Sequence, residues 1–269
     1  MTKFYSGRLF FRVAQVLSVI LFFTITSCNN GSSAVYPAAK GFNEKGSDKK
    51  AIEIVDRMME KMGGYEAWEK ARFIGWTYFG QYNIWDKREG LFRHEKGNLI
   101  SIMNLSKRAG QVYINGAQVA DSVRMYGYLS TAYTHFVANS YFLCLPYKMK
   151  DPGVTLLYRG EGQTMDGKAA DIVRLIFNEV GISPENMHDV WIDKETGLIS
   201  QWGFYATRSD KTPAFVRKWA DYKDYNGVKL ASNRNSYSDT LSLSHITVTD
   251  FVPKDVFLSP KPIDKSQVK

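Results

Sequence analysis

The chain has 269 residues, a formal net charge of +8 and two cysteines. Its 44% hydrophobic and 23% charged residues are typical of a folded protein and exclude wholesale disorder. Two cysteines are too few for a disulfide scaffold or a four-thiolate zinc site. The aromatic content of 14% favours strands and apolar binding surfaces, and the length allows one large domain or two small ones.

Residues 1–27 have the pattern of a lipoprotein signal peptide. Three basic residues and no acidic residue precede an apolar run over 13–25, which is too short to span a hydrocarbon core of about 30 Å comfortably. The following Ile25-Thr26-Ser27-Cys28 resembles the bacterial lipobox, in which the cysteine is diacylated and becomes the first residue of the mature chain. We therefore predict lipidation of Cys28. An ordinary signal peptide with a chance cysteine, or an N-terminal membrane anchor, is the alternative.

Removal of this signal lowers the net charge of the chain, and lipidation of Cys28 leaves a single free cysteine. It takes away three of the 35 basic residues and none of the 27 acidic ones, so the net charge falls from +8 to +5 and needs no nucleic-acid partner to explain it. With Cys28 lipidated, Cys144 is the one free thiol. Its neighbours in Tyr141-Phe142-Leu143-Cys144-Leu145 favour a buried small hydrophobe over a nucleophile.

The predicted lipid places the protein in the cell envelope. Two or three acyl chains give stable anchoring, whereas a single chain is marginal. Asn29 follows the cysteine, and the absence of an Asp at this position favours the outer membrane in well-studied Gram-negative lipoproteins. Residues 28–47 are rich in Asn, Gly, Ser, Lys and Ala without periodicity, and we predict that they form a flexible tether.

The folded domain is predicted to begin with a helix over 49–62 that ends at Gly63-Gly64, followed by a short helical turn over 65–70 that carries Trp68. Apolar residues at spacings of three and four give the first helix one apolar face. That face consists of Ile52, Val55, Met58, Met59 and Met62.

From residue 71 the pattern changes to alternation with period two. We predict strands over 72–82, 85–95 and 99–106, and a hairpin through Asn115-Gly116, since Asn-Gly supplies the positive φ of a type I′ turn. Apolar residues on both faces of the first strand indicate that both faces of its sheet are covered. Residues 122–143 instead predict one helix, or two interrupted ones, apolar nearly all round and therefore buried or covering an apolar cavity.

The rest of the chain predicts an antiparallel meander. Together with the earlier strands it indicates a β-rich α+β fold with a single strongly curved antiparallel sheet, an incomplete barrel, whose concave face is covered by helices. The domain is expected over 48–258, and the polar tail 259–269 is expected to fray. The later strands are predicted at 154–160, 169–177, 187–193, 197–207, 214–225, 228–236 and 240–251.

A search for catalytic motifs is negative. The sequence contains no phosphate loop, dinucleotide fingerprint, nucleophile elbow or His-Glu-x-x-His helix, so we predict no catalytic residue, no metal site and no cofactor. Neighbours on a strand point to opposite faces, so His94-Glu95 and His188-Asp189 do not converge without a bulge. Packing or surface roles are predicted for all the histidines, which are His94, His135, His188 and His245.

A helix held against the concave side of a curved sheet forms an apolar cleft, which is the default site for a ligand. A packed core without space for a ligand is the alternative. The residues predicted to line the cleft are Trp76, Tyr78, Trp85, Met125, Leu129, Tyr133, Phe136, Trp191, Trp202, Phe204 and Trp219.

Two segments carry a resemblance to the LolA/LolB/LppX-like superfamily of lipoprotein and lipid carriers. The stretch Val190-Trp191-Ile192-Asp193-Lys194-Glu195-Thr196-Gly197-Leu198-Ile199 looks like the strand, Asp-containing turn and Gly that begin the hairpin backing the cavity in those proteins. Lys61-Met62-Gly63-Gly64-Tyr65-Glu66-Ala67-Trp68 is similar to the end of the first helix in many uncharacterised Gram-negative lipoproteins. The resemblance covers the layout of about residues 48 to 255. It implies a half-barrel that takes up acyl chains passively, with helix displacement controlling entry.

We therefore expect a monomeric, non-enzymatic, membrane-anchored periplasmic protein that binds a lipid, a lipoprotein acyl chain or another hydrophobic ligand, without nucleic acid or cofactor. Two alternatives remain open. One is an envelope hydrolase that uses His94 or His188 with Asp189. The other is an adaptor of envelope complexes, which would show an exposed apolar patch instead of an internal cleft.

Overall fold

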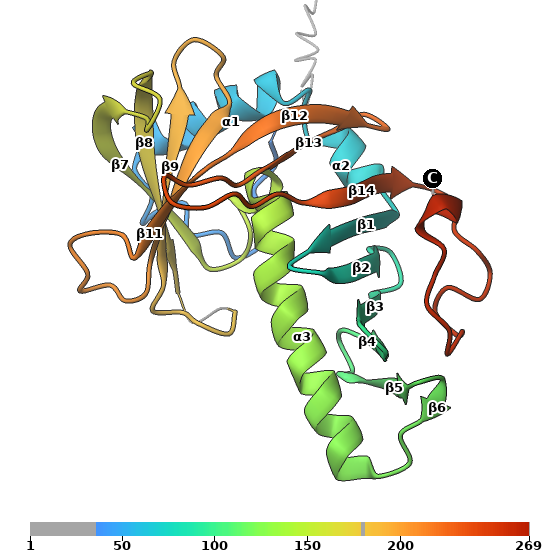
Figure 1. The fold of residues 1–269 in the computed structure, drawn as a ribbon. Helices are drawn as coiled ribbons and strands as arrows, with labels where there is room; N and C mark the ends of the chain where they lie inside the picture. The colour runs from blue at the N-terminus through green and yellow to red at the C-terminus, as the bar shows by residue number, and fades with distance from the viewer. Residues whose placement is uncertain (1–35, 179–180, 269) are drawn as a thin grey trace, which may run out of the picture. The chain divides into compact units, whose positions relative to one another are not determined.

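The computed structural model describes residues 36–178 and 181–268, so the predicted signal and Cys28 lie outside the described residues. Within these ranges the helices are α1 (Lys49–Lys61), α2 (Glu66–Lys70), α3 (Ser122–Cys144) and the 3₁₀-helices η1 (Leu145–Lys148) and η2 (Lys265–Gln267) (Figure 1).

The strands of the described chain form three antiparallel sheets. A seven-stranded sheet has the order β14-β1-β2-β3-β4-β5-β6, a five-stranded sheet has the order β11-β10-β9-β8-β7, and β12 pairs with β13. Their bounds are β1 (Phe73–Tyr78), β2 (Gln81–Asp86), β3 (Leu91–Lys96), β4 (Leu99–Asn104), β5 (Ala109–Ile114), β6 (Ala117–Gln118), β7 (Val154–Gln163), β8 (Ala169–Phe177), β9 (Met187–Asp193), β10 (Ile199–Tyr205), β11 (Phe215–Lys218), β12 (Ala220–Tyr225), β13 (Val228–Asn233) and β14 (Ser244–Thr249).

The β-rich α+β class and an open, curved antiparallel sheet accompanied by a helix are confirmed. The sequence predicts one continuous sheet, whereas hydrogen bonding divides the strands. The long helix α3 follows β6, and the chain then resumes with β7, which pairs with β8 and not with an earlier strand. The predicted strand over 214–225 is likewise divided at Trp219 into β11 and β12, which belong to different sheets.

Turns in the aromatic-rich N-terminal region explain why strands are shorter than predicted. Phe79 and Gly80 adopt φ values of 49° and 69° and separate β1 from β2. A second turn separates β2 from β3, and the Asp86 side chain accepts two backbone N–H bonds from it, at 3.0 and 3.1 Å. The predicted Asn115-Gly116 hairpin is confirmed, with φ values of 53° and 80°.

The predicted helix over 122–143 is confirmed as the single helix α3. Asp121 caps its first turn by accepting the backbone N–H of Arg124 at 2.7 Å. Leu129, Ala132 and Leu143 are buried on α3, which contacts β4, β5 and β13 (Figure 1).

The opposite face of the seven-stranded sheet is covered by the residues that follow β14. The guanidinium of the fully buried Arg93 pairs with Glu95 at 2.6 Å and donates to the carbonyls of Val256, Ser259 and Lys261 at 3.0, 2.7 and 2.5 Å. The prediction that both faces of this sheet are covered is confirmed. These contacts hold residues 256–261 against the sheet.

The described end of the predicted tether also packs on the domain. Tyr36 is buried, and the Asn43 amide donates to Thr155 Oγ1 at 2.9 Å. Ser47 Oγ accepts the backbone N–H of Leu156 at 2.9 Å. Residues 43–48 therefore lie beside the start of β7.

Candidate functional site

A pocket of about 140 Å³ lies between the C-terminal half of α3 and the five-stranded sheet. Its described lining contains no charged side chain, and most of it is aromatic or aliphatic. Helix α3 contributes Val137, Ala138, Tyr141 and Phe142, and strands β8 to β10 contribute Phe177, His188, Trp202 and Phe204.

Strand register places the aromatic side chains of this wall on one face of the sheet. Phe204 pairs directly with His188 across β10 and β9, and directly paired residues in antiparallel strands point to the same side. Trp202 lies two residues from Phe204 and shares that side. The ring centroid of Trp202 is 5.0 Å from that of Phe142 on α3, so the helix closes the pocket against the sheet.

His188, in the described pocket wall, has a buried ring nitrogen, Nδ1, that lacks a hydrogen-bond partner. Its ring centroid lies 5.2 to 6.0 Å from those of four aromatic side chains, Tyr141, Phe177, Trp202 and Phe204. Burial lowers the pKa of this imidazole to about 3, because the charged form would lose its hydration without gaining a partner. The ring is therefore neutral at pH 7.

The C-terminal end of α3 is held by a fully buried arginine. Arg234 donates from Nε and Nη2 to the carbonyl of Phe142, at 3.0 and 2.6 Å. It also donates to the carbonyls of Ala231 and Asn233, and its guanidinium lies 3.4 Å from the ring centroid of Trp219. The carbonyls at a helix C-terminus carry partial negative charge, so this end of α3 stabilises the cation. Burial lowers the pKa of Arg234 to about 9, which leaves it charged at neutral pH.

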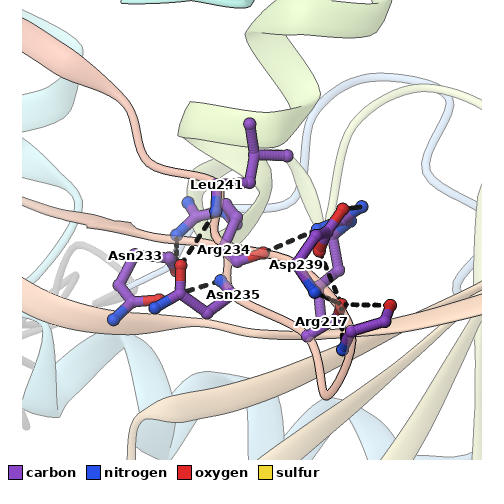
Figure 2. Close-up of polar contacts among 8 residues, drawn as sticks. Arg217, Asn233, Arg234, Asn235, Asp239 and Leu241 are labelled. Carbon is purple, nitrogen blue, oxygen red and sulfur yellow. Dashed lines mark hydrogen bonds and ion pairs between the residues drawn. The ribbon is translucent and has the colours of Figure 1, made fainter.

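A second arginine fixes the backbone around Arg234 (Figure 2). Arg217 forms a bidentate ion pair with Asp239, at 2.8 and 2.9 Å, and donates to the Arg234 carbonyl at 3.0 Å. The Arg234 N–H donates to the Leu241 carbonyl at 2.7 Å, and Asn235 Oδ1 accepts the Leu241 N–H at 2.9 Å. These bonds orient the guanidinium toward α3.

The predicted cleft residues divide into three groups. Trp202 and Phe204 line the pocket. Trp191 lies on the opposite face of β9, since it pairs with Gln201 and not with Trp202. The others pack in the core between α3 and the sheets or at its border; they are Trp76, Tyr78, Trp85, Met125, Leu129, Tyr133, Phe136 and Trp219.

Sequence reasoning missed a buried polar cluster between α3 and the seven-stranded sheet. His94 Nε2 lies 3.2 Å from Nδ1 of His135 on α3, although the two residues are 41 positions apart. The Asn83 amide donates to the Gln81 carbonyl at 3.1 Å, so its Oδ1 accepts from His94 Nδ1 at 3.0 Å. Burial, and to a smaller extent His135, lowers the pKa of His94 to about 3. Both nitrogens of His94 are thus hydrogen-bonded in the neutral form.

The arrangement needed by a His–Asp hydrolase is not formed at the predicted residues. Asp189 lies on the other face of β9 from His188, where it accepts two bonds from Arg174, both at 2.7 Å, and one from Tyr205 at 2.8 Å. Glu95 follows His94 in β3 but points to the opposite face of the sheet, where it forms an ion pair with Arg93. Burial raises the pKa of the Cys144 thiol to about 12, so it is protonated at neutral pH. Among the described residues, no three His, Cys, Asp or Glu side chains gather as metal ligands.

Comparison with known proteins leaves the family open. Neither a protein-family model nor a curated protein sequence matches the chain. A DUF1329 family protein from Desulfovibrio piger is similar in structure, with a TM-score of 0.42 and 11% identity over 78% of this chain and 96% of that one. A domain described as outer membrane lipoprotein-sorting from Vibrio parahaemolyticus gives 0.40 and 10% over 78% and 97%. Both TM-scores are below 0.5.

Within residues 36–178 and 181–268, no helix combines the length and the hydrophobicity of a membrane span.

We predict that Arg234→Met lowers the free energy of unfolding by about 2–4 kcal/mol. The substitution leaves buried carbonyls of Phe142, Ala231 and Asn233 without their donor, while removal of the buried charge offsets part of the cost. Arg159→Met makes the same chemical change at an exposed position and is expected to stay within about 0.5 kcal/mol. Urea denaturation measures both, and equal stability of the two variants would contradict this role of Arg234.

We predict that His188 contributes to loss of stability in acid. Between its ordinary pKa of 6.5 and its folded pKa of about 3, the unfolded chain binds a proton at this residue that the folded chain does not bind. Stability therefore falls as the pH falls through this window, by about 1.4 kcal/mol per pH unit. In His188→Phe the slope of unfolding free energy between pH 6 and pH 4 should decrease by that amount. His245→Phe, which removes an exposed imidazole, is the matched control, and an unchanged slope in His188→Phe would refute the prediction.

Proposed function

We propose that this chain is a membrane-anchored envelope protein that holds an uncharged apolar group of a lipid or lipoprotein in the pocket between α3 and the five-stranded sheet. The observation that carries the proposal is a pocket whose described lining is mostly aromatic and aliphatic, with Ser183, Asn186 and His188 as its polar residues and no charged side chain. Moving an ionised headgroup into such surroundings is costly, whereas an alkyl or aryl group gains from leaving water. The anchor is the predicted lipid on Cys28, which lies outside the described residues.

The size of the pocket limits what enters it. A cavity of about 150 Å³ holds a molecule the size of benzene, and this pocket has about 140 Å³. A long acyl chain would therefore place one end in the pocket and leave the rest outside, unless α3 moves away from the sheet. Such a movement would separate Val137, Ala138 and Tyr141 of α3 from the sheet. Within the described chain, these side chains line the pocket and form no hydrogen bond to the sheet.

The strength of binding follows from the same size. Burial of an aromatic group of this size gains about 3 kcal/mol, which corresponds to a Kd in the millimolar range. A fragment is thus expected to bind weakly. For a natural ligand, proximity to the membrane through the anchor would raise the local concentration of lipid and compensate for weak contact in the pocket.

We predict that fluorobenzene binds the purified protein with a millimolar Kd and that Ala138→Phe abolishes binding by filling the pocket from α3. Fluorine NMR of the ligand measures the affinity directly. Thr134→Phe places the same ring one turn earlier on α3, at an exposed position outside the pocket lining, and should leave binding unchanged. Equal binding by wild type and by both variants, or no binding by the wild type, would contradict the proposed site.

A further inference from the structure

Two buried polar atoms that lack a hydrogen-bond partner lie in the pocket wall. Five buried side-chain atoms of the described chain lack a hydrogen-bond partner, and those of His188 and Trp202 belong to the pocket wall. The other three, on Trp76, Trp219 and Ser101, lie elsewhere. A buried donor or acceptor left unpaired is costly, and each such group in a folded protein calls for an explanation.

His188 differs from the other buried histidine, His94, in its hydrogen bonding. His94 is also enclosed, but Asn83 and His135 satisfy its two ring nitrogens. His188 is more than nine-tenths buried, and no hydrogen bond to its ring is found among the described residues. The fold therefore supplies partners for both nitrogens of one buried imidazole, whereas Nδ1 of the other, which belongs to the pocket wall, has none.

We propose that the pocket selects apolar groups that carry one neutral hydrogen-bonding group, such as a hydroxyl, which pairs with His188. This inference rests on the proposed function and specifies the ligand of the same pocket. A neutral imidazole offers one donor and one acceptor, and a hydroxyl can meet either. An ionised carboxylate is disfavoured, because no cationic side chain occurs in the described lining. A purely hydrocarbon group would fit the space but leave the imidazole unpaired.

The test compares phenol with toluene, which have the same ring and differ by a hydroxyl in place of a methyl group. The affinity ratio of phenol to toluene is measured by NMR titration for the wild type and for His188→Phe. Phenol and toluene differ in hydrophobicity, and this difference cancels when the two ratios are compared. The ratio is expected to fall by about tenfold in the variant, the effect of one hydrogen bond to a buried group. His188→Asn, which keeps a neutral donor and acceptor, should retain part of the preference.

The outcomes separate this inference from the proposed function. If toluene and phenol bind and Ala138→Phe abolishes both, but the ratio is the same in the wild type and in His188→Phe, the role of His188 is refuted while the pocket stands. If neither ligand binds the wild type, the proposed function itself fails.

A measurement on the wild type covers the case in which the variants do not fold. The imidazole nitrogen resonances of His188 should shift on addition of phenol and shift much less with toluene. Equal shifts with both ligands would overturn the inference.

Discussion

The buried guanidinium of Arg234 is the constraint on which the site depends. A charge taken out of water must be met by polar partners, and here these are the Phe142 carbonyl at the end of α3, two carbonyls of the chain around β13 and the face of Trp219. Satisfying one side chain therefore brings three parts of the chain to one place. Phe142 and Trp219 also lie 5.0 and 6.4 Å from Trp202, measured between ring centroids, so the same contact fixes the wall of the pocket.

Helix α3 is held differently on its two sides. Toward the seven-stranded sheet it makes directional contacts, His135 to His94 and Asn139 to Gln81. Toward the five-stranded sheet, the described residues show apolar contact and no hydrogen bond from the helix. Directional bonds fix the helix to one sheet, while apolar contact permits small separations without unpaired polar groups. The pocket lies on the side where the helix is held by packing alone, which suits a site that admits an apolar ligand.

Local patterns predict much of the fold. The single long helix, the first helix, β8, β9 and the Asn115-Gly116 hairpin all follow from periodicity and turn chemistry. The site was harder to predict, because it depends on register. Ile199 pairs with Ile192, but a bulge before Gln201 shifts the pairing by one residue, so that Phe204 and not Gly203 faces His188. A slip of one residue reverses the faces of a strand. Continuous pairing from the predicted turn would have placed Trp202 beside Asp189. The other pocket residues could not be told apart from core residues in the sequence, because core and pocket are built from the same aromatic residue types.

The central claim is that the pocket holds part of a lipid or another hydrophobic ligand, and its most direct test is to identify what accompanies the protein on purification. Wild type and Ala138→Phe, purified in parallel, would be extracted with organic solvent and compared by mass spectrometry. We predict that the wild type carries lipid or another apolar molecule that is depleted in Ala138→Phe and retained in Thr134→Phe. If the extracts from wild type and from Ala138→Phe contain the same apolar molecules in the same amounts, the proposed pocket is contradicted.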